Sequence, residues 1–191
     1  MKTKLRIAIP IASAILLMTS MAMKSASTKW FTKNGHIDFY SHTSIEDIQA
    51  DNENVISVID TEKAKIEFKA PINAFIFKKK LMQEHFNENY MESEKYPDAK
   101  FSGTLTNNTD INYNVNGNYE INCQGKLTMH GVTKDVVAKG ILTVNNLALN
   151  LKSTFNVNLD DYNISIPGAV KDKISKSIKV GINCNYKLFS N

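Results

Sequence analysis

Long runs in which apolar and polar residues alternate constrain the fold of this chain more than any other feature. From 178 to 188 every even-numbered residue is apolar, and the residues between are Lys, Asn or Gly. Similar alternation runs through 119–129 and 147–159. Successive side chains of a strand point to opposite faces, so each run predicts a strand with one dry and one wet face. Such strands are typical of antiparallel sheets, because strands covered on both faces are continuously apolar.

The length of these strands narrows the fold further. Several of the runs exceed ten residues, and short turn sequences separate them, at 107–110, at 145–147 and around Gly131. Asn and Gly suit such turns because they tolerate left-handed backbone angles. Long one-sided strands joined by short turns favour a strongly bent sheet or a barrel. We therefore predict an all-β, antiparallel fold, either a strongly bent sheet or a β-barrel.

One segment, residues 78–91, has no period of two and predicts a helical insertion. Its apolar residues recur at spacings of three to five, which would place one face of a helix toward the core: Leu81, Met82, His85, Phe86 and Tyr90. A shorter helical turn is predicted at 44–49, where Ser44 stands at the capping position.

The first residues have the layout of a secretory signal peptide. Lys2, Lys4 and Arg6 precede an apolar run at 7–18, and small residues follow. The run is shorter than the roughly 20 residues that span a bilayer, so no stable span is expected after cleavage. We predict a signal peptide at 1–22, with cleavage as late as 26, and a barrel domain at 29–190. The predicted location is periplasmic or secreted; an uncleaved amphipathic anchor is the alternative.

Charge and cysteine content limit the functions that fit. The chain has 23 Lys plus Arg and 19 Asp plus Glu, and removal of residues 1–22 leaves 20 against 19. A nearly neutral mature protein lacks the basic footprint of a nucleic-acid-binding protein. Cys123 and Cys184 lie on the dry sides of their runs. They fit either two buried apolar side chains or a disulfide in an exported protein.

Candidates for catalysis and metal binding are weak. His36, Asp38, Tyr40 and His42 share one strand face, but Ile37 and Phe39 make the other face the dry one. The sequence contains no HExxH, GxSxG or SxxK motif. The pair Asp160–Asp161 is better explained by a turn than by acid–base chemistry. We predict no enzyme, no metal and no cofactor, with His130 or the aspartate pair as the residues of an enzymatic alternative.

The stretch LTMHGVTK, residues 127–134, looks at first like a catalytic motif. Leu127 and Met129 belong to a dry face, which puts His130 on the wet one, and Gly131 then turns the chain. We interpret the stretch as a hairpin tip, in which His130 stabilises the turn by hydrogen bonds to its neighbours, with Thr133 as a candidate partner.

Bulky apolar residues expected to face inward have two interpretations. A small barrel either fills its interior with side chains or leaves room for one ligand, and an apolar lining would select an elongated apolar molecule. From composition alone, a packed core is the simpler interpretation. The candidate ligand-binding residues are Phe39, Phe68, Phe75, Phe77, Met82, Phe86, Phe101, Leu105, Met129, Leu142, Leu149 and Phe155.

Three segments together resemble the YceI-like family. GKLTMHGVTKDV at 125–136 matches the pattern G-x-L-T-x-H-G-V-T-K at every fixed position. HFNENYMESEKYPDAKFSG at 85–103 is similar to the family's helix, acidic connector and Tyr-Pro strand entry. DYNISIP at 161–167 is similar to its aspartate-tyrosine segment. The resemblance extends from about 33 to 188, and the short stretch between His42 and Val55 resembles a compact branch.

This resemblance implies a lipocalin-like barrel of about eight strands with a helical insertion. It also implies an exported protein that carries or sequesters a polyisoprenoid or similar apolar chain, since some members bind quinone-type or polyprenyl lipids. It gives no catalytic residue. The alternative is a structural or interaction protein of the cell envelope with a solidly packed barrel. An envelope protein partner and a homodimer both remain open.

Overall fold

The computed structural model describes residues 28–146 and 148–189. The predicted signal peptide, both cleavage points and the last residue of the predicted domain, Ser190, lie outside this part of the chain. So does Leu147, in the predicted turn at 145–147.

Nine strands account for most of the described chain. They are β1 (Lys29–His42), β2 (Asp47–Asp60), β3 (Lys65–Pro71), β4 (Ile76–Phe77), β5 (Asp98–Leu105), β6 (Gly117–Met129), β7 (Val132–Asn145), β8 (Ala148–Asn158) and β9 (Ser177–Leu188). The helical elements are short: η1 (Ile72–Ala74), α1 (Lys80–His85), η2 (Phe86–Tyr90), η3 (Asn108–Asp110), η4 (Leu159–Tyr162) and η5 (Gly168–Val170). The predicted runs of alternation coincide with β6, β8 and β9.

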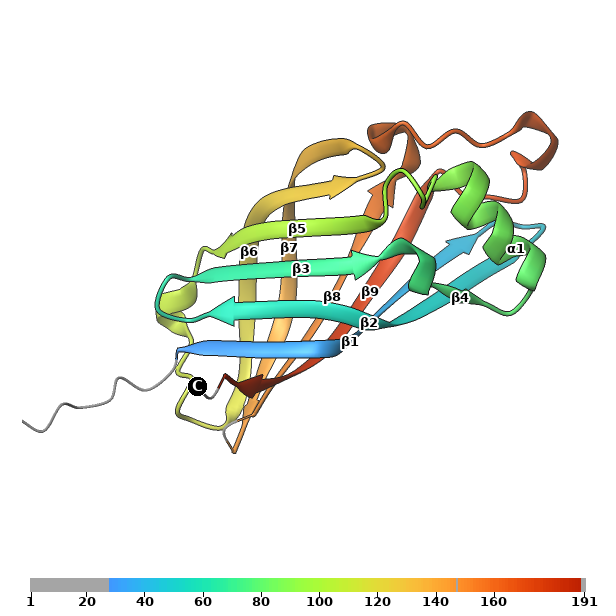
Figure 1. Cartoon of the computed structure of the whole chain (residues 1–191). Helices are drawn as coiled ribbons and strands as arrows, with labels where there is room; N and C mark the ends of the chain where they lie inside the picture. Colours follow the sequence, from blue (N-terminus) through green and yellow to red (C-terminus); the bar gives the residue numbers. More distant parts are fainter. Residues whose placement is uncertain (1–27, 147, 190–191) are drawn as a thin grey trace, which may run out of the picture.

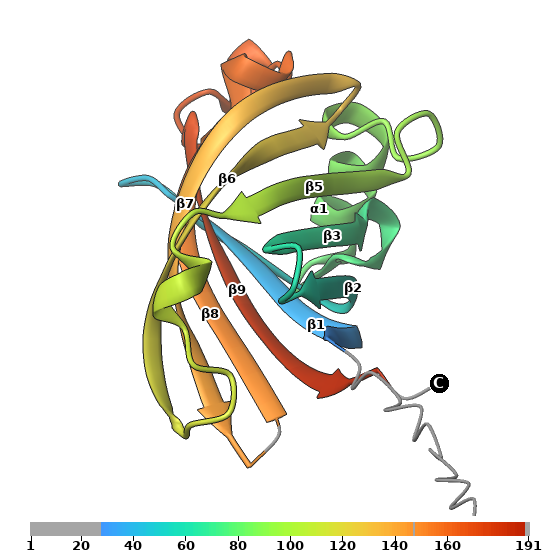
Figure 2. The same cartoon turned by 90° about the vertical axis from the view of Figure 1, so that its left-hand side faces the viewer.

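Eight of these strands close an antiparallel barrel (Figures 1 and 2). Their order is β1-β9-β8-β7-β6-β5-β3-β2, and an additional pairing of β1 with β2 completes the ring. The two-residue β4 adds to the end of β2, where Phe77 pairs with Ala50. The predicted fold class, an antiparallel barrel of about eight strands with a short helical insertion, is confirmed.

One end of the barrel is filled by side chains. The two described ends of the chain meet there, where the Phe189 N–H donates to the Lys29 carbonyl. Its apolar core consists of Trp30, Ile59, Ile66, Leu105, Ile111, Ile121, Cys123, Leu142, Val144, Leu149, Leu151, Cys184 and Tyr186. Within it the Tyr186 hydroxyl lies 2.8 Å from Ser57 Oγ, which donates in turn to the Glu67 carbonyl. This pairing satisfies the buried hydroxyls at the packed end of the barrel.

The other end is surrounded by the β1–β2 turn, the α1–η2 segment and the loop from η4 to β9 (Figure 1). The predicted helix at 78–91 exists, but it has two parts, an α-helix followed by one π-helical turn. Leu81 is wrong as a core-facing residue, because its side chain is 62% exposed. The predicted helical turn at 44–49 is also wrong. Thr43 Oγ1 accepts the N–H groups of Ile45 and Glu46 in a tight turn, and β2 begins at Asp47.

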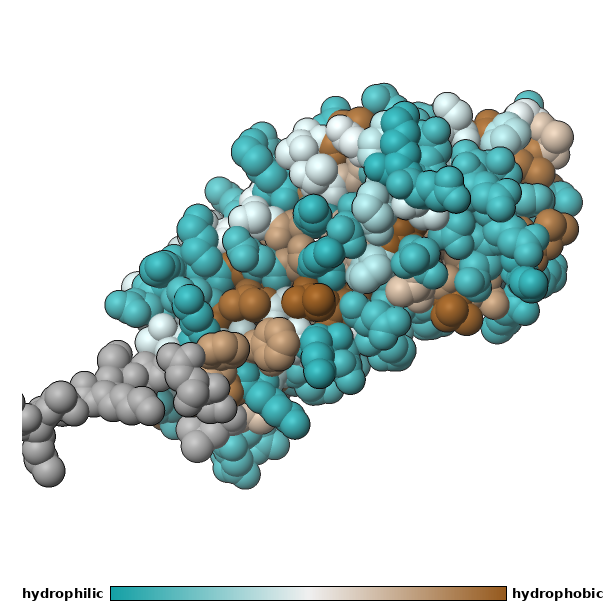
Figure 3. Space-filling model, in the orientation of Figure 1, coloured by the Kyte–Doolittle hydropathy of each residue, from teal (hydrophilic) through white to brown (hydrophobic). Residues whose placement is uncertain are grey.

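The outer surface is mostly hydrophilic in the view of Figure 3, with scattered apolar side chains. The part of the chain that the structure describes contains no helix with the length and hydropathy of a membrane span. Cys123 and Cys184 are buried and free, so the sequence's disulfide alternative does not occur in this structure. Burial raises the pKa of each thiol to about 11.

Candidate functional site

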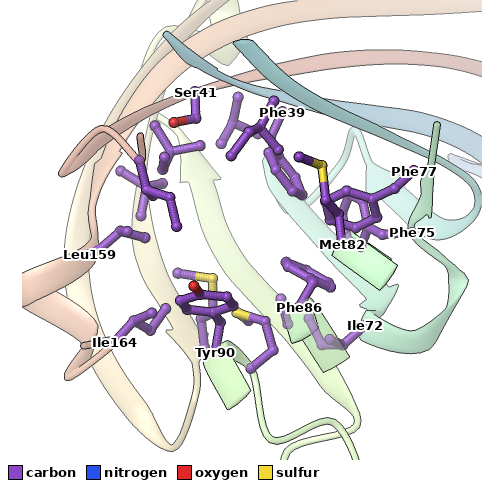
Figure 4. A pocket seen from close by; sticks show the side chains of 18 of the residues that line it. Phe39, Ser41, Ile72, Phe75, Phe77, Met82, Phe86, Tyr90, Leu159 and Ile164 are labelled. Atoms are coloured by element: carbon purple, nitrogen blue, oxygen red, sulfur yellow. The ribbon is translucent and has the colours of Figure 1, made fainter. Parts of the chain in front are cut away.

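A cavity of about 280 Å³ occupies the barrel end opposite the packed core. Eight of the nine strands contribute to its wall, together with η1, α1, η2, η4 and the loop that follows. Figure 4 shows the lining side chains converging on a central space. They are Ile37, Phe39, Ser41, Glu46, Ile48, Ala70, Ile72, Phe75, Phe77, Met82, His85, Phe86, Tyr90, Met91, Ala99, Leu127, Met129, Phe155, Val157, Leu159, Ile164, Val170, Lys173, Ile174, Ile178 and Val180. The wall is therefore overwhelmingly apolar.

Four phenylalanines form one side of the cavity. The ring of Phe86 stacks on that of Phe39 at 5.4 Å between centroids, and meets Phe75 and Phe77 at 5.7 and 5.0 Å. These rings come from β1, β4, η2 and the residue that follows η1. Aromatic pairs at such separations stabilise one another beyond their area burial. The cluster thus fixes the helical segment against the barrel rim.

The π-helical turn η2 orients three residues toward this space. The Met91 N–H donates to the Phe86 carbonyl, five residues back, instead of four. Phe86, Tyr90 and Met91 all line the cavity as a result. Single π-turns occur frequently at functional sites, and here the turn widens the face that the segment presents.

The predicted ligand-binding residues separate into three groups. Seven line the main cavity: Phe39, Phe75, Phe77, Met82, Phe86, Met129 and Phe155. Phe68 and Phe101 line a smaller cavity of about 90 Å³, which Phe155 also lines. Leu105, Leu142 and Leu149 line neither cavity and belong to the packed core. Their inward orientation follows from alternation, but their level along the barrel axis does not.

The smaller cavity adjoins the larger one. The two share five lining residues, which are Ile37, Ala70, Ala99, Leu127 and Phe155. Ala70 and Ala99 pair directly between β3 and β5, so two small side chains face each other at this level. The shared residues show that the two cavities adjoin, with the smaller one on the side of the packed core.

Sequence reasoning missed the lining from the loop between η4 and β9. This loop contributes Ile164, Val170, Lys173 and Ile174, and no periodicity marks them. Ser41 and Val180 could have been found, since they occupy the dry face of runs that the alternation already identifies. The loop is attached to the barrel by Ser41, whose hydroxyl oxygen accepts the Ser175 N–H at 2.9 Å.

Charged groups lie mainly at the rim. The Lys79 ammonium is 3.2 Å from the Glu46 carboxylate and links the start of α1 to the β1–β2 turn. Inside, the hydroxyl of Tyr90 is one of few polar groups. Burial raises the pKa of Tyr90, so the phenol stays protonated and can donate. A wall of this kind can exclude water from an apolar molecule.

The hairpin motif lies against the outside of this cavity end. His130 Nδ1 donates to the Tyr162 carbonyl at 3.0 Å, and Nε2 lies 3.1 Å from the Glu92 carboxylate. The His130 ring also meets the Tyr96 ring edge-on at 4.9 Å. We predicted that His130 stabilises the turn through its neighbours in the sequence. Its partners instead lie in two distant segments, so its contacts extend well beyond the turn. The predicted partner Thr133 is wrong as well, because its hydroxyl pairs with Thr128 instead.

The histidines of the β1 wet face are held by neighbouring carboxylates. His36 lies 3.0 Å from Asp51, and His42 lies 2.6 Å from Asp47. Across the described ranges, no group of three or more His, Cys, Asp or Glu side chains could hold a metal ion.

Comparisons with known proteins agree on one family. The model of the YceI-like domain matches residues 22–186. A UPF0312 protein of Pseudomonas putida strain F1 is 32% identical over 97 residues, which cover 48% of this chain and 47% of the relative. The relative from strain GB-1 is 31% identical over a stretch of the same length and coverage. The chain thus spans about half the length of these curated relatives.

Solved structures with the same fold extend this agreement. A polyisoprenoid binding domain from Saccharophagus degradans, implicated in plant cell wall breakdown, superposes with a TM-score of 0.75 at 11% identity and covers 85% of this chain and 99% of that one. Burkholderia cenocepacia BcnA gives 0.65 at 12% identity, covering 80% and 95%. A Campylobacter jejuni YceI protein gives 0.59 at 16%, covering 75% and 86%. At such identities the likeness establishes the fold alone.

Proposed function

The chain belongs to the YceI-like domain family, and on that premise we propose that it carries or sequesters a polyisoprenoid or similar apolar lipid inside its barrel. The observation that supports this most directly is the apolar cavity of about 280 Å³ at one barrel end. A neighbour in fold is a polyisoprenoid binding domain, which agrees with an apolar chain as the ligand class.

The size of the cavity limits what it can hold. An apolar cavity of about 150 Å³ is enough to admit benzene. The present cavity, at about 280 Å³, suits a short branched chain or one end of a longer chain. The smaller cavity of about 90 Å³ adjoins it.

Binding requires no chemical step. At roughly 25 cal/mol per Å² of apolar surface removed from water, a chain that buries a few hundred Å² gains several kcal/mol before the costs of association. The alternative of a solidly packed envelope protein lacks a comparable observation, because only one half of the barrel is filled.

Organic extraction of protein purified from its own host, followed by mass spectrometry, tests the proposal. We expect a co-purifying apolar lipid in the wild-type protein and its loss in Ala99→Phe. Ala99 lines both cavities, so a phenyl ring there takes up space in which the lipid would lie. The matched control is Ser102→Phe, on the exposed face of the same strand, which should retain the lipid. Absence of lipid from repeated wild-type preparations would contradict carriage.

We also propose that the protein works in the periplasm or outside the cell. The support is the basic start followed by the apolar run at 7–18. The intact mass of the protein recovered from its host tests this. Loss of residues 1–22 or 1–26 is expected, and a full-length chain in the cytoplasm would exclude export.

A further inference from the structure

The outer face of β7, β8 and β9 carries an excess of positive charge. Its outward-pointing charged residues are Asp135, Lys139, Lys152, Lys179 and Lys187. Asp135 lies 2.8 Å from the Lys126 ammonium on β6, so it is already neutralised. In the part of the chain that the structure describes, none of the other four forms an ion pair. The chain after residue 22 has 20 Lys plus Arg against 19 Asp plus Glu, so the excess belongs to this face and not to the whole molecule.

Strand register spreads these lysines along the barrel wall. Lys152 on β8 pairs with Asn183 on β9, and Lys179 on β9 pairs with Asn156 on β8. Lys187 is eight residues beyond Lys179 on the same strand, which at about 3.3 Å per residue places it roughly 26 Å away. The remaining outward residues of β8 and β9 are uncharged: Ala148, Asn150, Thr154, Asn158, Ser177, Gly181 and Asn185. The β7–β9 face is therefore a long strip on which the free charge is entirely positive.

Two apolar side chains protrude from the same strip. Val137 is 68% exposed and Ile141 is 41% exposed, and both lie on the outward side of β7. Ile141 pairs directly with Lys152 on β8. Surfaces that bind lipid bilayers from the aqueous side combine apolar residues, which enter the headgroup boundary, with basic residues that attract anionic lipids. The β7–β9 face has both components side by side.

We propose that the β7–β9 face docks on an anionic lipid bilayer, with its lysines at the lipid head groups and Val137 and Ile141 in the headgroup boundary. The three strands are direct neighbours and run along one wall of the barrel (Figure 2). Together they are only about 10 Å wide, so long lysine side chains from all three can reach one plane. The outer wall of a barrel is convex. A fluid bilayer adapts to such a shape, whereas a folded acidic partner would need a matching concave surface.

This docking surface is distinct from the proposed ligand site. Lys152, Lys179 and Val137 line neither the cavity of about 280 Å³ nor the one of about 90 Å³. Substitutions at these three positions therefore test the surface without altering either cavity.

Co-sedimentation with vesicles tests the proposal. The wild-type protein should bind vesicles of phosphatidylglycerol and phosphatidylcholine in equal parts, fail to bind phosphatidylcholine alone, and dissociate as salt screens the charges. Lys152→Gln combined with Lys179→Gln should weaken binding by roughly 25-fold, at about fivefold for each lysine beside an anionic surface. The matched control is Lys63→Gln with Lys80→Gln, at exposed positions in the β2–β3 turn and on α1. It removes the same charge and should leave the affinity within about twofold.

The apolar component has a separate test. Val137→Ser should weaken binding to the anionic vesicles without changing how steeply binding falls with salt, because salt does not screen an apolar contact.

Three results would overturn the proposal. The wild type could bind anionic and neutral vesicles alike, the two double variants could lose affinity equally, or Val137→Ser could bind as tightly as the wild type. Thermal unfolding verifies that each variant is folded. Both double variants should also retain any co-purifying lipid, so failure of the docking surface leaves the proposed carriage standing.

Discussion

At the scale of single residues, three parts of the family resemblance meet around His130. Its ring joins the β6–β7 hairpin to Glu92 in the acidic connector and to the Tyr162 carbonyl in the aspartate-tyrosine segment. Gly131 has a φ of +75°, and a Cβ there would lie 2.7 Å from the Tyr96 ring. The motif thus marks a junction between segments that are far apart in the sequence.

Replacement of His130 by Asn should disrupt this junction and leave the turn itself intact. His130 has a φ of +51°, which Asn tolerates well, so the hairpin remains while both ring hydrogen bonds are lost. We expect a loss of about 1–3 kcal/mol in the free energy of unfolding, measured by urea denaturation. His42→Asn, at a 69% exposed side chain, is the control and should change stability little. An equal change in the free energy of unfolding for the two variants would show that the junction at His130 does not stabilise the protein.

Sequence reasoning located this turn but not its partners. Gly131 marks the turn because positive φ favours glycine. The partners of His130 lie 32 and 38 residues away, in segments without period-two alternation. A local pattern cannot bring such segments together, since their approach depends on how the closed barrel arranges its loops. The nearby Thr133 was therefore the natural but wrong choice.

At the scale of elements, the helical segment shows what a periodic pattern can and cannot predict. Spacings of three to five correctly place Met82, Phe86 and Tyr90 on the cavity side. They fail for Leu81, because the segment is a short α-helix followed by a π-turn and no longer follows one helical period. Apolar character alone could not reveal this change, which depends on contacts with the phenylalanine cluster.

A pair of truncations in this segment should differ strongly. Phe86→Ala removes a ring that contacts three other phenylalanines, and we expect a loss of about 3 kcal/mol in the free energy of unfolding. Leu81→Ala changes an exposed side chain and should stay within about 0.5 kcal/mol. Urea unfolding of both variants measures the difference. Comparable losses would mean that the segment packs by its other face.

At the scale of the whole molecule, alternation predicts the barrel but not its hollow half. Leu142 and Met129 are both inward residues of the β6–β7 hairpin, yet one is packed and the other lines the cavity. The difference depends on the height of each residue along the barrel axis. The register of the eight strands determines which residues lie at the same height. The candidate lining residues therefore mix core and cavity positions.

The packed half should make the barrel sensitive to alkaline pH. Burial raises the pKa of Cys123 and Cys184 from 9.0 to about 11, and that of Tyr113 from 10.0 to about 12. Between pH 9 and 11 the unfolded chain releases thiol protons that the native barrel retains. The unfolded state then binds fewer protons, so the free energy of unfolding falls as pH rises, by up to about 1.4 kcal/mol per pH unit for each thiol.

Urea midpoints at pH 8, 9, 10 and 11 measure this slope. Below pH 9 the thiols are protonated in both states, and their contribution is constant. Cys123→Ala with Cys184→Ala should flatten the curve between pH 9 and 10, before tyrosine titration becomes dominant. A wild-type midpoint that stays level from pH 9 to 11 would show that the thiols ionise freely in the native barrel.

The closed barrel also limits the order in which its strands can pair during folding. β1 pairs with β2 through a short turn, but its other neighbour is β9, and Trp30 meets Leu188. Contacts so distant along the chain form slowly, because a long loop must close first. Until β9 arrives, one side of β1 remains an open edge that can pair with another molecule. The last strand therefore protects the nascent barrel from aggregation, and the period before it docks is when the protein is most vulnerable.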